Sequence, residues 1–389
     1  MRPNRTAKAF FADEARVSLP AGDRAMTHRA MTPMVSATID TAALRHNLQV
    51  LRQWAPRSRV MAVIKANAYG HGLVAVARAL ESADAFAVAR VDEGMTLRRA
   101  GITTPTVLLE GVFDSGQLEA AAAAGFELVV HTAEQIDLLR AAPPGATFKI
   151  WLKLDTGMNR LGFKGQAFDA AHAALSALPA VCSPVNLFTH LSSADDPELS
   201  TTADQLARFR AATATLPGER SIANSAGLLS YADAQADWVR PGLLLYGASP
   251  FAGSVGADYG LKPAMTLHSH VIAVKDLEVG ERVGYGGDWT AQRPTRLAVA
   301  AVGYGDGYPR SLGSGSPVLV NDERVPLAGR VSMDMIGIDV SGMKRPPALG
   351  DSVTLWGEGL PVEEIAVWAD TIPYELLCGI SQRVAVDLR

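Results

Sequence analysis

The segment from Val60 to Gly72, VMAVIKANAYGHG, decides the expected fold. Its apolar run up to Ile64 is typical of a strand that is buried on both faces, as in a parallel sheet. Lys65 ends this run, and the glycines that follow permit a tight turn before the next helix. Parallel barrels carry their catalytic groups at the carboxyl ends of their strands, so Lys65 is a candidate catalytic residue. A single lysine at a strand end is also commonly a residue that extends into solvent.

Short apolar runs alternate with amphipathic stretches on both sides of this segment. The apolar runs predict eight strands, at 37–40, 60–65, 85–89, 107–109, 128–131, 148–154, 185–190 and 221–224. Three- and four-residue spacing predicts helices at 42–54, 73–82, 117–124, 133–141 and 203–215. This alternation favours an α/β fold, a (β/α)8 barrel of the TIM type, over residues 36–262. A doubly wound sheet would give the same alternation.

The pattern changes after Tyr246. Turns rich in glycine and proline separate short β-branched runs, at 267–274, 296–302, 317–320, 335–340 and 352–355. Helical spacing is confined to 362–369. We therefore expect a second, mostly β domain over residues 263–389.

The first 35 residues show no periodic pattern and form an N-terminal extension that we expect to be disordered. Acidic residues interrupt its arginines and no apolar segment follows them, so a secretory signal is not expected. The translation start could instead lie at Met26, Met31 or Met34.

Composition excludes several classes of function. The formal net charge of -4 gives no reason to expect nucleic acid or an anionic membrane as a partner. No apolar stretch is long enough to span a bilayer. Cys182 and Cys378 are too few and too far apart for a disulfide framework or a zinc site, so no metal is expected. Buried thiols fit a reducing compartment, and we expect a cytoplasmic protein.

Four further polar residues are candidates for a functional role, and each has an ordinary structural interpretation. Ser225 could bind phosphate at a helix start or simply cap that helix. Arg240 taken alone would be a surface arginine. His190 would be a core histidine, and Tyr285, which lies between glycines, would be a turn residue.

Together, however, these segments resemble one family. Residues 63–72 resemble the pyridoxal-phosphate attachment site of alanine racemases. The resemblance continues in order from about residue 36 to the C-terminus, through 153–162, 187–195, 224–227, 238–247, 282–289, 303–310, 330–335 and 372–378. It implies a barrel that binds pyridoxal phosphate, a β domain behind it, and a head-to-tail homodimer. The implied reaction converts L-alanine and D-alanine into each other, for peptidoglycan synthesis or for alanine catabolism.

The resemblance also assigns the residues that hold the cofactor. Lys65 would carry it as a Schiff base, and Arg240 would donate to its pyridine nitrogen. A guanidinium keeps its protons, so the ring nitrogen would stay unprotonated and electron withdrawal would be restrained. The implied phosphate ligands are Tyr69, Ser225, Gly242, Leu243 and Tyr374.

Racemisation removes a proton from one face of Cα and delivers one to the other, which two acid–base groups achieve most simply. The resemblance assigns Tyr285 to L-alanine and Lys65 to D-alanine. A phenol needs help to act as a base near neutrality. His190 would supply it, bonded to Tyr285 on one side and to Arg240 on the other. The family places Tyr285 in the active site of the opposite subunit, so each site would be composite.

The substrate residues are likewise implied by the resemblance. Arg160 would bind the alanine carboxylate, because a planar guanidinium can donate two parallel hydrogen bonds to a carboxylate. Lys153 matches a position that is often carbamylated, which would create an anion able to orient Arg160. Met333 and Asp334 would reach in from the second subunit, and Tyr304 would narrow the entrance.

Two other functions remain as alternatives. A pyridoxal-phosphate amino-acid decarboxylase could share the architecture, but Tyr285 together with Met333 and Asp334 argues against it. A non-catalytic pyridoxal-phosphate-binding protein would need only the barrel, and the β domain argues against that. Activity on serine stays open.

Overall fold

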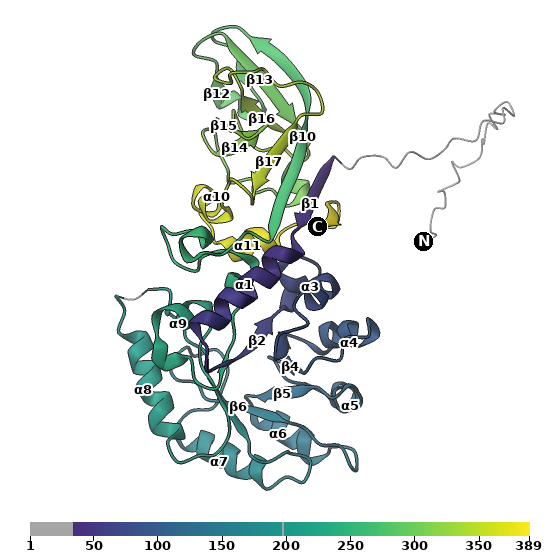
Figure 1. The fold of residues 1–389 in the computed structure, drawn as a ribbon, viewed down its shortest axis with the longest axis vertical. Helices are drawn as coiled ribbons and strands as arrows, with labels where there is room; N and C mark the ends of the chain where they lie inside the picture. Colours follow the sequence, from purple (N-terminus) through teal and green to yellow (C-terminus); the bar gives the residue numbers. More distant parts are fainter. Residues whose placement is uncertain (1–33, 197) are drawn as a thin grey trace, which may run out of the picture. The chain divides into compact units, whose positions relative to one another are not determined.

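The computed structural model describes residues 34–196 and 198–389. The disorder expected for residues 1–35 falls outside the described residues except at Met34 and Val35, and Val35 begins a strand. Eight parallel strands, β2 to β9, close into a barrel in chain order, which confirms the predicted α/β barrel (Figure 1). The barrel strands are β2 (Arg59–Val63), β3 (Ala85–Val88), β4 (Thr106–Leu108), β5 (Glu127–Val130), β6 (Ile150–Lys153), β7 (Asn186–Phe188), β8 (Arg220–Ser221) and β9 (Trp238–Val239).

One helix precedes the first barrel strand, the others follow barrel strands, and the sequence shows why they form. In α1 (Thr41–Trp54), the Asp40 carboxylate accepts hydrogen bonds from the N–H groups of Ala42 and Ala43 and so caps the helix. Two others, α4 (Val91–Arg99) and α7 (Gly165–Ser176), were not predicted. The α4 sequence buries only Gly94 and Leu97, too few for a clear apolar face. The remaining barrel helices are α2 (Lys65–Tyr69), α3 (Leu73–Ala79), α5 (Ser115–Ala124), α6 (Ala133–Arg140), α8 (Thr201–Thr213) and α9 (Ser225–Ser230).

One predicted strand does not belong to the barrel. Residues 37–40 were expected to open it, but they form β1 (Val35–Ile39), which pairs with β10 (Met265–Leu277) and β18 (Ala385–Leu388). The prediction was wrong because buried and half-buried residues alternate in β1. This pattern is typical of a sheet that has one face exposed to solvent. Barrel strands such as β3 are buried throughout.

The eighth barrel strand is β9, which was not predicted because its apolar pair, Trp238 and Val239, is followed at once by Arg240 and Pro241. The strand numbers inferred from sequence therefore shift by one. Lys65 follows the first barrel strand rather than the second, and Ser225 follows the seventh rather than the eighth. All of these residues still lie at carboxyl ends of strands, so the inference about the barrel mouth is unaffected.

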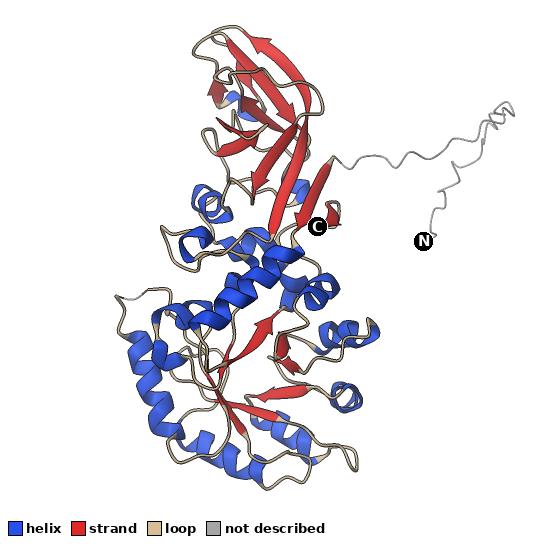
Figure 2. Cartoon of the chain, in the orientation of Figure 1, coloured by secondary structure: helices blue, strands red, loops and turns tan. Residues whose placement is uncertain are grey.

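The C-terminal residues form the expected sheet-rich part (Figure 2). The long strand β10 pairs with β1, β13 and β17, and β1 also pairs with β18, so β1 joins the first residues of the described chain to the last. A short hairpin, β11 (Arg282–Val283) with β12 (Trp289–Thr290), lies apart from this sheet. The other elements are β13 (Thr295–Ala300), β14 (Pro317–Val320), β15 (Glu323–Pro326), β16 (Ile336–Asp339), β17 (Ser352–Trp356), α10 (Val362–Trp368) and α11 (Pro373–Cys378). None of the helices in the described ranges is long and apolar enough to cross a membrane.

Candidate active site

Lys65 stands at the carboxyl end of β2, where the chain enters a turn of unusual geometry. The next four residues, Ala66 to Tyr69, have positive φ angles between 52° and 54°. A left-handed conformation costs a non-glycine residue about 1–2 kcal/mol. Four in succession persist only where surrounding contacts hold them, and such strain gathers at functional sites.

Glu93, in the first turn of α4, supplies one of these contacts. Its Oε1 accepts a hydrogen bond from the Ala66 N–H at 2.7 Å, and its Oε2 accepts one from the Ala89 N–H at 2.8 Å. The carboxylate therefore joins the residue after Lys65 to the end of the neighbouring strand. Sequence reasoning missed Glu93. The available signal was an acidic residue three positions into the helix after a barrel strand.

His71 holds the other end of the turn. The ring is fully buried, and its Nδ1 lies 3.0 Å from the Ala68 carbonyl oxygen and 2.8 Å from that of Tyr69. Because carbonyl oxygens only accept, Nδ1 carries the proton. Burial lowers the pKa of His71 to about 4, so the ring is neutral at physiological pH.

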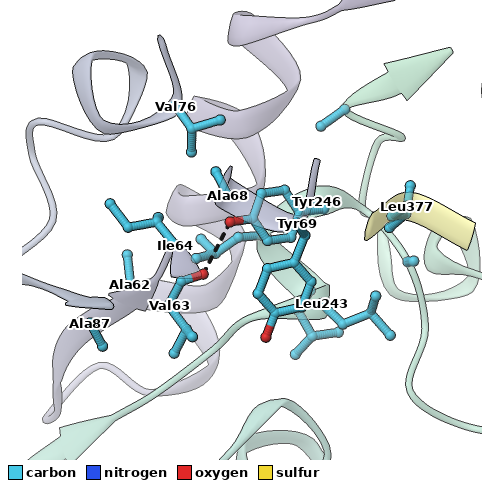
Figure 3. Close-up of a cluster of buried hydrophobic side chains, with 14 of the residues drawn as sticks. Ala62, Val63, Ile64, Ala68, Tyr69, Val76, Ala87, Leu243, Tyr246 and Leu377 are labelled. Atoms are coloured by element: carbon cyan, nitrogen blue, oxygen red, sulfur yellow. Dashed lines mark hydrogen bonds between the residues drawn. The ribbon is translucent and has the colours of Figure 1, made fainter. Parts of the chain in front are cut away.

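The C-terminal helix α11 packs directly on this turn. A Cβ atom at Gly70 would lie 2.1 Å from the Leu377 carbonyl oxygen, so only glycine permits the approach. The Tyr69 ring stacks on Tyr246 at 4.8 Å and lies 5.8 Å from the Tyr374 ring of α11. Figure 3 shows Tyr69, Tyr246 and Leu377 grouped around the turn. The chain thus returns to the barrel mouth, as the role proposed for Tyr374 requires.

The other predicted phosphate ligands gather beside Tyr69. A Cβ atom at Gly242 would lie 2.4 Å from the Tyr69 hydroxyl, so this glycine leaves space for the phenol. The Gly242 N–H donates to the Ser225 Oγ at 3.0 Å, and Leu243 is fully buried directly after it. Tyr69, Ser225 and Gly242 therefore converge, although they lie on three separate segments.

Both phenols in this group stay protonated. Burial, with smaller contributions from Tyr374 and Cys378, raises the pKa of Tyr69 far above its ordinary value. Burial and the nearby Asp195 raise the pKa of Tyr374 to about 12. Each phenol is therefore a neutral hydrogen-bond donor at physiological pH, as an anionic phosphate group requires.

Arg240 follows β9 and is almost completely buried, with 3% of its surface exposed. Its guanidinium donates to the Ser221 Oγ at 2.7 Å, to the Thr189 carbonyl at 2.7 Å and to the Ile222 carbonyl at 3.0 Å. Among the described residues no carboxylate pairs with it. Burial lowers the pKa of Arg240 to about 9, so the group remains a cation at neutral pH. The interpretation of a surface arginine was wrong.

Next to it lies His190, two residues after the end of β7. The Arg240 Nη2 lies 3.3 Å from the His190 Nδ1. Because a guanidinium only donates, Nδ1 accepts and the ring proton of the neutral histidine resides on Nε2. Burial, followed by the charges of Arg240, Lys153, Arg160 and Lys65, holds the pKa of His190 well below its usual value.

Lys153, at the end of β6, completes a group of positive charges. Burial, together with the charges of Arg240, Arg160 and Lys65 and against the opposing effect of Asp155, lowers the pKa of Lys153 to about 8. Its side chain is not on an outward-facing surface, because only 6% of the residue is exposed. The basic side chains of Lys65, Arg160 and Arg240 thus lie near enough to Lys153 and His190 to lower the pKa of both.

A buried glutamine links two of the loops that carry these charges. The Gln205 Nε2, on α8, donates to the Thr156 Oγ1 at 3.0 Å and to the His190 carbonyl at 3.1 Å. Thr156 lies at the start of the exposed loop that bears Arg160. Gln205 therefore fixes the Arg160 loop relative to His190. It was not predicted, because a glutamine inside an amphipathic helix has no distinctive sequence signal.

The predicted residues of the C-terminal part lie on an exposed surface. Tyr285 is 73% exposed in the β11–β12 hairpin, and Tyr304 and Met333 are also exposed. Asp334 is exposed next to Met333. Within the described ranges, no hydrogen bond or ion pair joins these four residues to Lys65, His190 or Arg240. A single chain therefore brings the barrel residues together, but it does not join its own Tyr285, Tyr304, Met333 and Asp334 to them.

Comparison with known proteins matches both parts of the chain. Residues 39–250 match the family model described as "Alanine racemase, N-terminal domain", and residues 264–387 match "Alanine racemase, C-terminal domain". The chain is 51% identical to the alanine racemase of Aeromonas hydrophila over 351 residues, which cover 90% of this chain and 98% of that protein. It is 50% identical to the alanine racemase of Yersinia pestis over 352 residues, covering 90% of this chain and 98% of that one.

Solved structures of alanine racemases are also similar to this chain. The biosynthetic alanine racemase of Pseudomonas aeruginosa has a TM-score of 0.88 at 42% identity, over 92% of this chain and all of that one. A structure of alanine racemase from Bartonella henselae with covalently bound pyridoxal phosphate has a TM-score of 0.83 at 30% identity, over 92% of this chain and all of that one.

Proposed function

The chain belongs to the alanine racemase family, and on this premise we propose that it converts L-alanine and D-alanine into each other with pyridoxal phosphate. The observation that carries the proposal is the group of Lys65, Lys153, Arg160 and Arg240 around a neutral His190. A phosphate and a substrate carboxylate are the anions that would balance these cations. The two protonated phenols and the Ser225 hydroxyl match the phosphate as well.

The residues present therefore fit the cofactor. Lys65 would hold it covalently through its amine, and Arg240 would donate to its ring nitrogen. Tyr69, Ser225, Gly242, Leu243 and Tyr374 would bind its phosphate. Pyridoxal phosphate, when bound, would accept the electron pair that remains on Cα after the α-proton leaves.

Two bases on opposite faces of Cα carry the proposed proton transfers. Lys65 would remove the proton of D-alanine, and the partner subunit's Tyr285 would remove that of L-alanine. The His190 Nε2–H would donate to the phenol oxygen and stabilise it once its proton has left. Arg240, bonded to Nδ1, fixes the ring orientation that this needs. The exposure of Tyr285 supports its use in a neighbouring subunit, so a homodimer with composite sites is part of the proposal.

Substrate binding completes the proposal. Arg160 would hold the alanine carboxylate, and Met333 and Asp334 of the neighbouring subunit would close the site behind Tyr304. Lys153 would bind CO2 through its neutral amine, forming an N–C bond and releasing one proton. The resulting carbamate anion would orient Arg160. A cytoplasmic location is also proposed. Cys182 and Cys378 are exposed, so the expectation of buried thiols was wrong, but both are free thiols, which supports a reducing compartment.

The test is an assay on both enantiomers with the cofactor present. Pure L-alanine and pure D-alanine should each end as an equal mixture, because enantiomers have equal free energy. Lys65→Ala should abolish the conversion. Release of CO2 without any change in chirality would contradict the proposal and favour a decarboxylase.

A further inference from the structure

Arg383, in the segment that leads into β18, contacts two separate loops of the C-terminal part. Its Nε lies 3.3 Å from the Asp306 Oδ1, and its Nη2 donates to the Asp334 Oδ1 at 2.7 Å. Asp306 belongs to the loop of Tyr304, and Asp334 follows Met333. One guanidinium therefore joins the two loops that carry the proposed entrance and substrate contacts.

The loop that contains Tyr304 is held from inside. Asp306 is buried, with 3% of its surface exposed, and its Oδ2 accepts a hydrogen bond from the Gly303 N–H at 3.0 Å. The Ser381 N–H donates to the Asp306 carbonyl at 3.1 Å. The C-terminal segment thus holds this loop through both its backbone and the Arg383 side chain.

The two loops also contact each other directly. The Tyr304 N–H donates to the Ser332 carbonyl at 3.0 Å, and the Gly305 N–H donates to the Met333 carbonyl at 2.9 Å. A Cβ atom at Gly305 would lie 2.5 Å from the Arg383 Nη1 and 3.0 Å from the Met333 carbonyl oxygen. The guanidinium therefore lies against the point where the loops meet.

The geometry of these ion pairs indicates that Arg383 orients the two loops and contributes little to the stability of the fold. The Arg383 and Asp334 side chains are about half exposed, and such an ion pair contributes little to stability. The second partner, Asp306, is buried, but its carboxylate also accepts the hydrogen bond from the Gly303 N–H and so does not depend on Arg383 alone. A planar guanidinium can address two carboxylates in fixed directions, whereas a lysine ammonium acts as a single point charge. Arg383 thus sets the relative position of two loops, and neither loop bonds to the Lys65 of its own chain.

We infer that Arg383 is a positioning residue that acts in trans, because it fixes the Tyr304 and Met333–Asp334 loops of one subunit for use in the active site of the other. The inference rests on the composite dimer of the proposed function. It predicts a defect in alanine binding, since these loops line the entrance and the carboxylate site, and little effect on the cofactor residues of the barrel.

The first experiment measures Arg383→Lys and Arg383→Ala as homodimers. We expect KM for alanine to rise about tenfold or more, a smaller loss in kcat, and unchanged thermal unfolding and cofactor absorbance. Arg296→Ala is the matched control, because Arg296 forms a similarly exposed pair with Asp276 at 2.8 Å in the same sheet. A wild-type KM in both Arg383 variants would overturn the inference. If Arg383→Ala does not fold, Arg383→Lys decides.

The second experiment separates action in trans from action within one subunit. A hybrid dimer of Arg383→Lys with Lys65→Ala, purified through two different tags, has one intact site if Arg383 acts in trans. That site takes Lys65 from the first subunit and both loops from the second. We expect about half the wild-type activity with a wild-type KM. A hybrid KM equal to that of the Arg383→Lys homodimer would overturn the inference.

A parallel hybrid of Tyr285→Phe with Lys65→Ala tests the composite site itself. It should also recover about half the wild-type activity. If it does and the Arg383 hybrid does not, only the role of Arg383 is wrong. If the Tyr285 hybrid stays inactive, the composite dimer of the proposed function is wrong and the inference falls with it.

Discussion

The Glu93 carboxylate accepts a hydrogen bond from the Ala66 N–H at 2.7 Å and so fixes the backbone directly after Lys65. Its second oxygen binds Ala89 beyond the next strand, so the lysine turn is anchored to the barrel and not only to itself. The left-handed residues 66–69 would otherwise relax toward ordinary φ angles. The geometry of the proposed cofactor anchor therefore depends on a residue outside its own segment.

Glu93→Gln tests this anchor. The amide keeps the size of the side chain but loses the charge, and a charge-assisted hydrogen bond contributes about 1.5–3 kcal/mol. We expect kcat to fall roughly tenfold to a hundredfold and the cofactor affinity to fall, as measured by absorbance titration. Glu119→Gln, on the exposed surface of α5, is the matched control. A folded Glu93→Gln protein with wild-type kcat and cofactor affinity would show that the contact is dispensable.

His71 makes the stability of the protein depend on pH. Its folded-state pKa of about 4 lies below the ordinary value of 6.5, so between these values the unfolded chain binds a proton that the folded chain does not. Stability from this group is therefore complete above about pH 6.5 and is lost as the pH falls toward 4. The expected loss is on the order of 3 kcal/mol.

His71→Asn is the variant for this measurement, because an amide N–H can replace the Nδ1 donor without titrating. Urea unfolding at a series of pH values should show a shallower decline below pH 6.5 in the variant than in the wild type. Parallel declines in the two proteins would mean that other groups, such as His190, account for the acid sensitivity.

Lys153 is expected to carry a carbamate. With a pKa of about 8, about a tenth of its amine is neutral at pH 7, and the surrounding cations favour an anionic product. Protein equilibrated with 13C-bicarbonate should show a carbamate carbon by NMR, and the signal should be missing in Lys153→Ala. The variant should bind alanine more weakly because Arg160 loses its orienting anion. A wild-type protein without the signal would contradict the proposal.

The barrel could be predicted from the sequence, and several residues expected in the site do lie together at its mouth. The errors have physical causes. Apolar runs identified seven of the barrel strands, but in β9 the apolar pair of Trp238 and Val239 is followed at once by Arg240 and shows no run. The residues of β1 alternate between buried and half-buried positions, which indicates a sheet with one solvent-exposed face. The segment was nevertheless predicted to be a barrel strand. Lys65 and Arg240 stood in segments that resemble a family. Glu93, Gln205 and Arg383 act through contacts between segments distant in the sequence, which no local pattern reports.

The central claim, that Lys65 and Tyr285 serve opposite faces of Cα, is tested most directly by α-proton exchange in deuterated water. In Tyr285→Phe, Lys65 should still exchange the α-proton of D-alanine, and the product should remain D-alanine. L-alanine should gain almost no deuterium and racemisation should be lost, whereas the wild type labels and racemises both enantiomers. If Tyr285→Phe racemises both enantiomers at the wild-type rate, or labels L-alanine as fast as D-alanine, the two-base account is wrong.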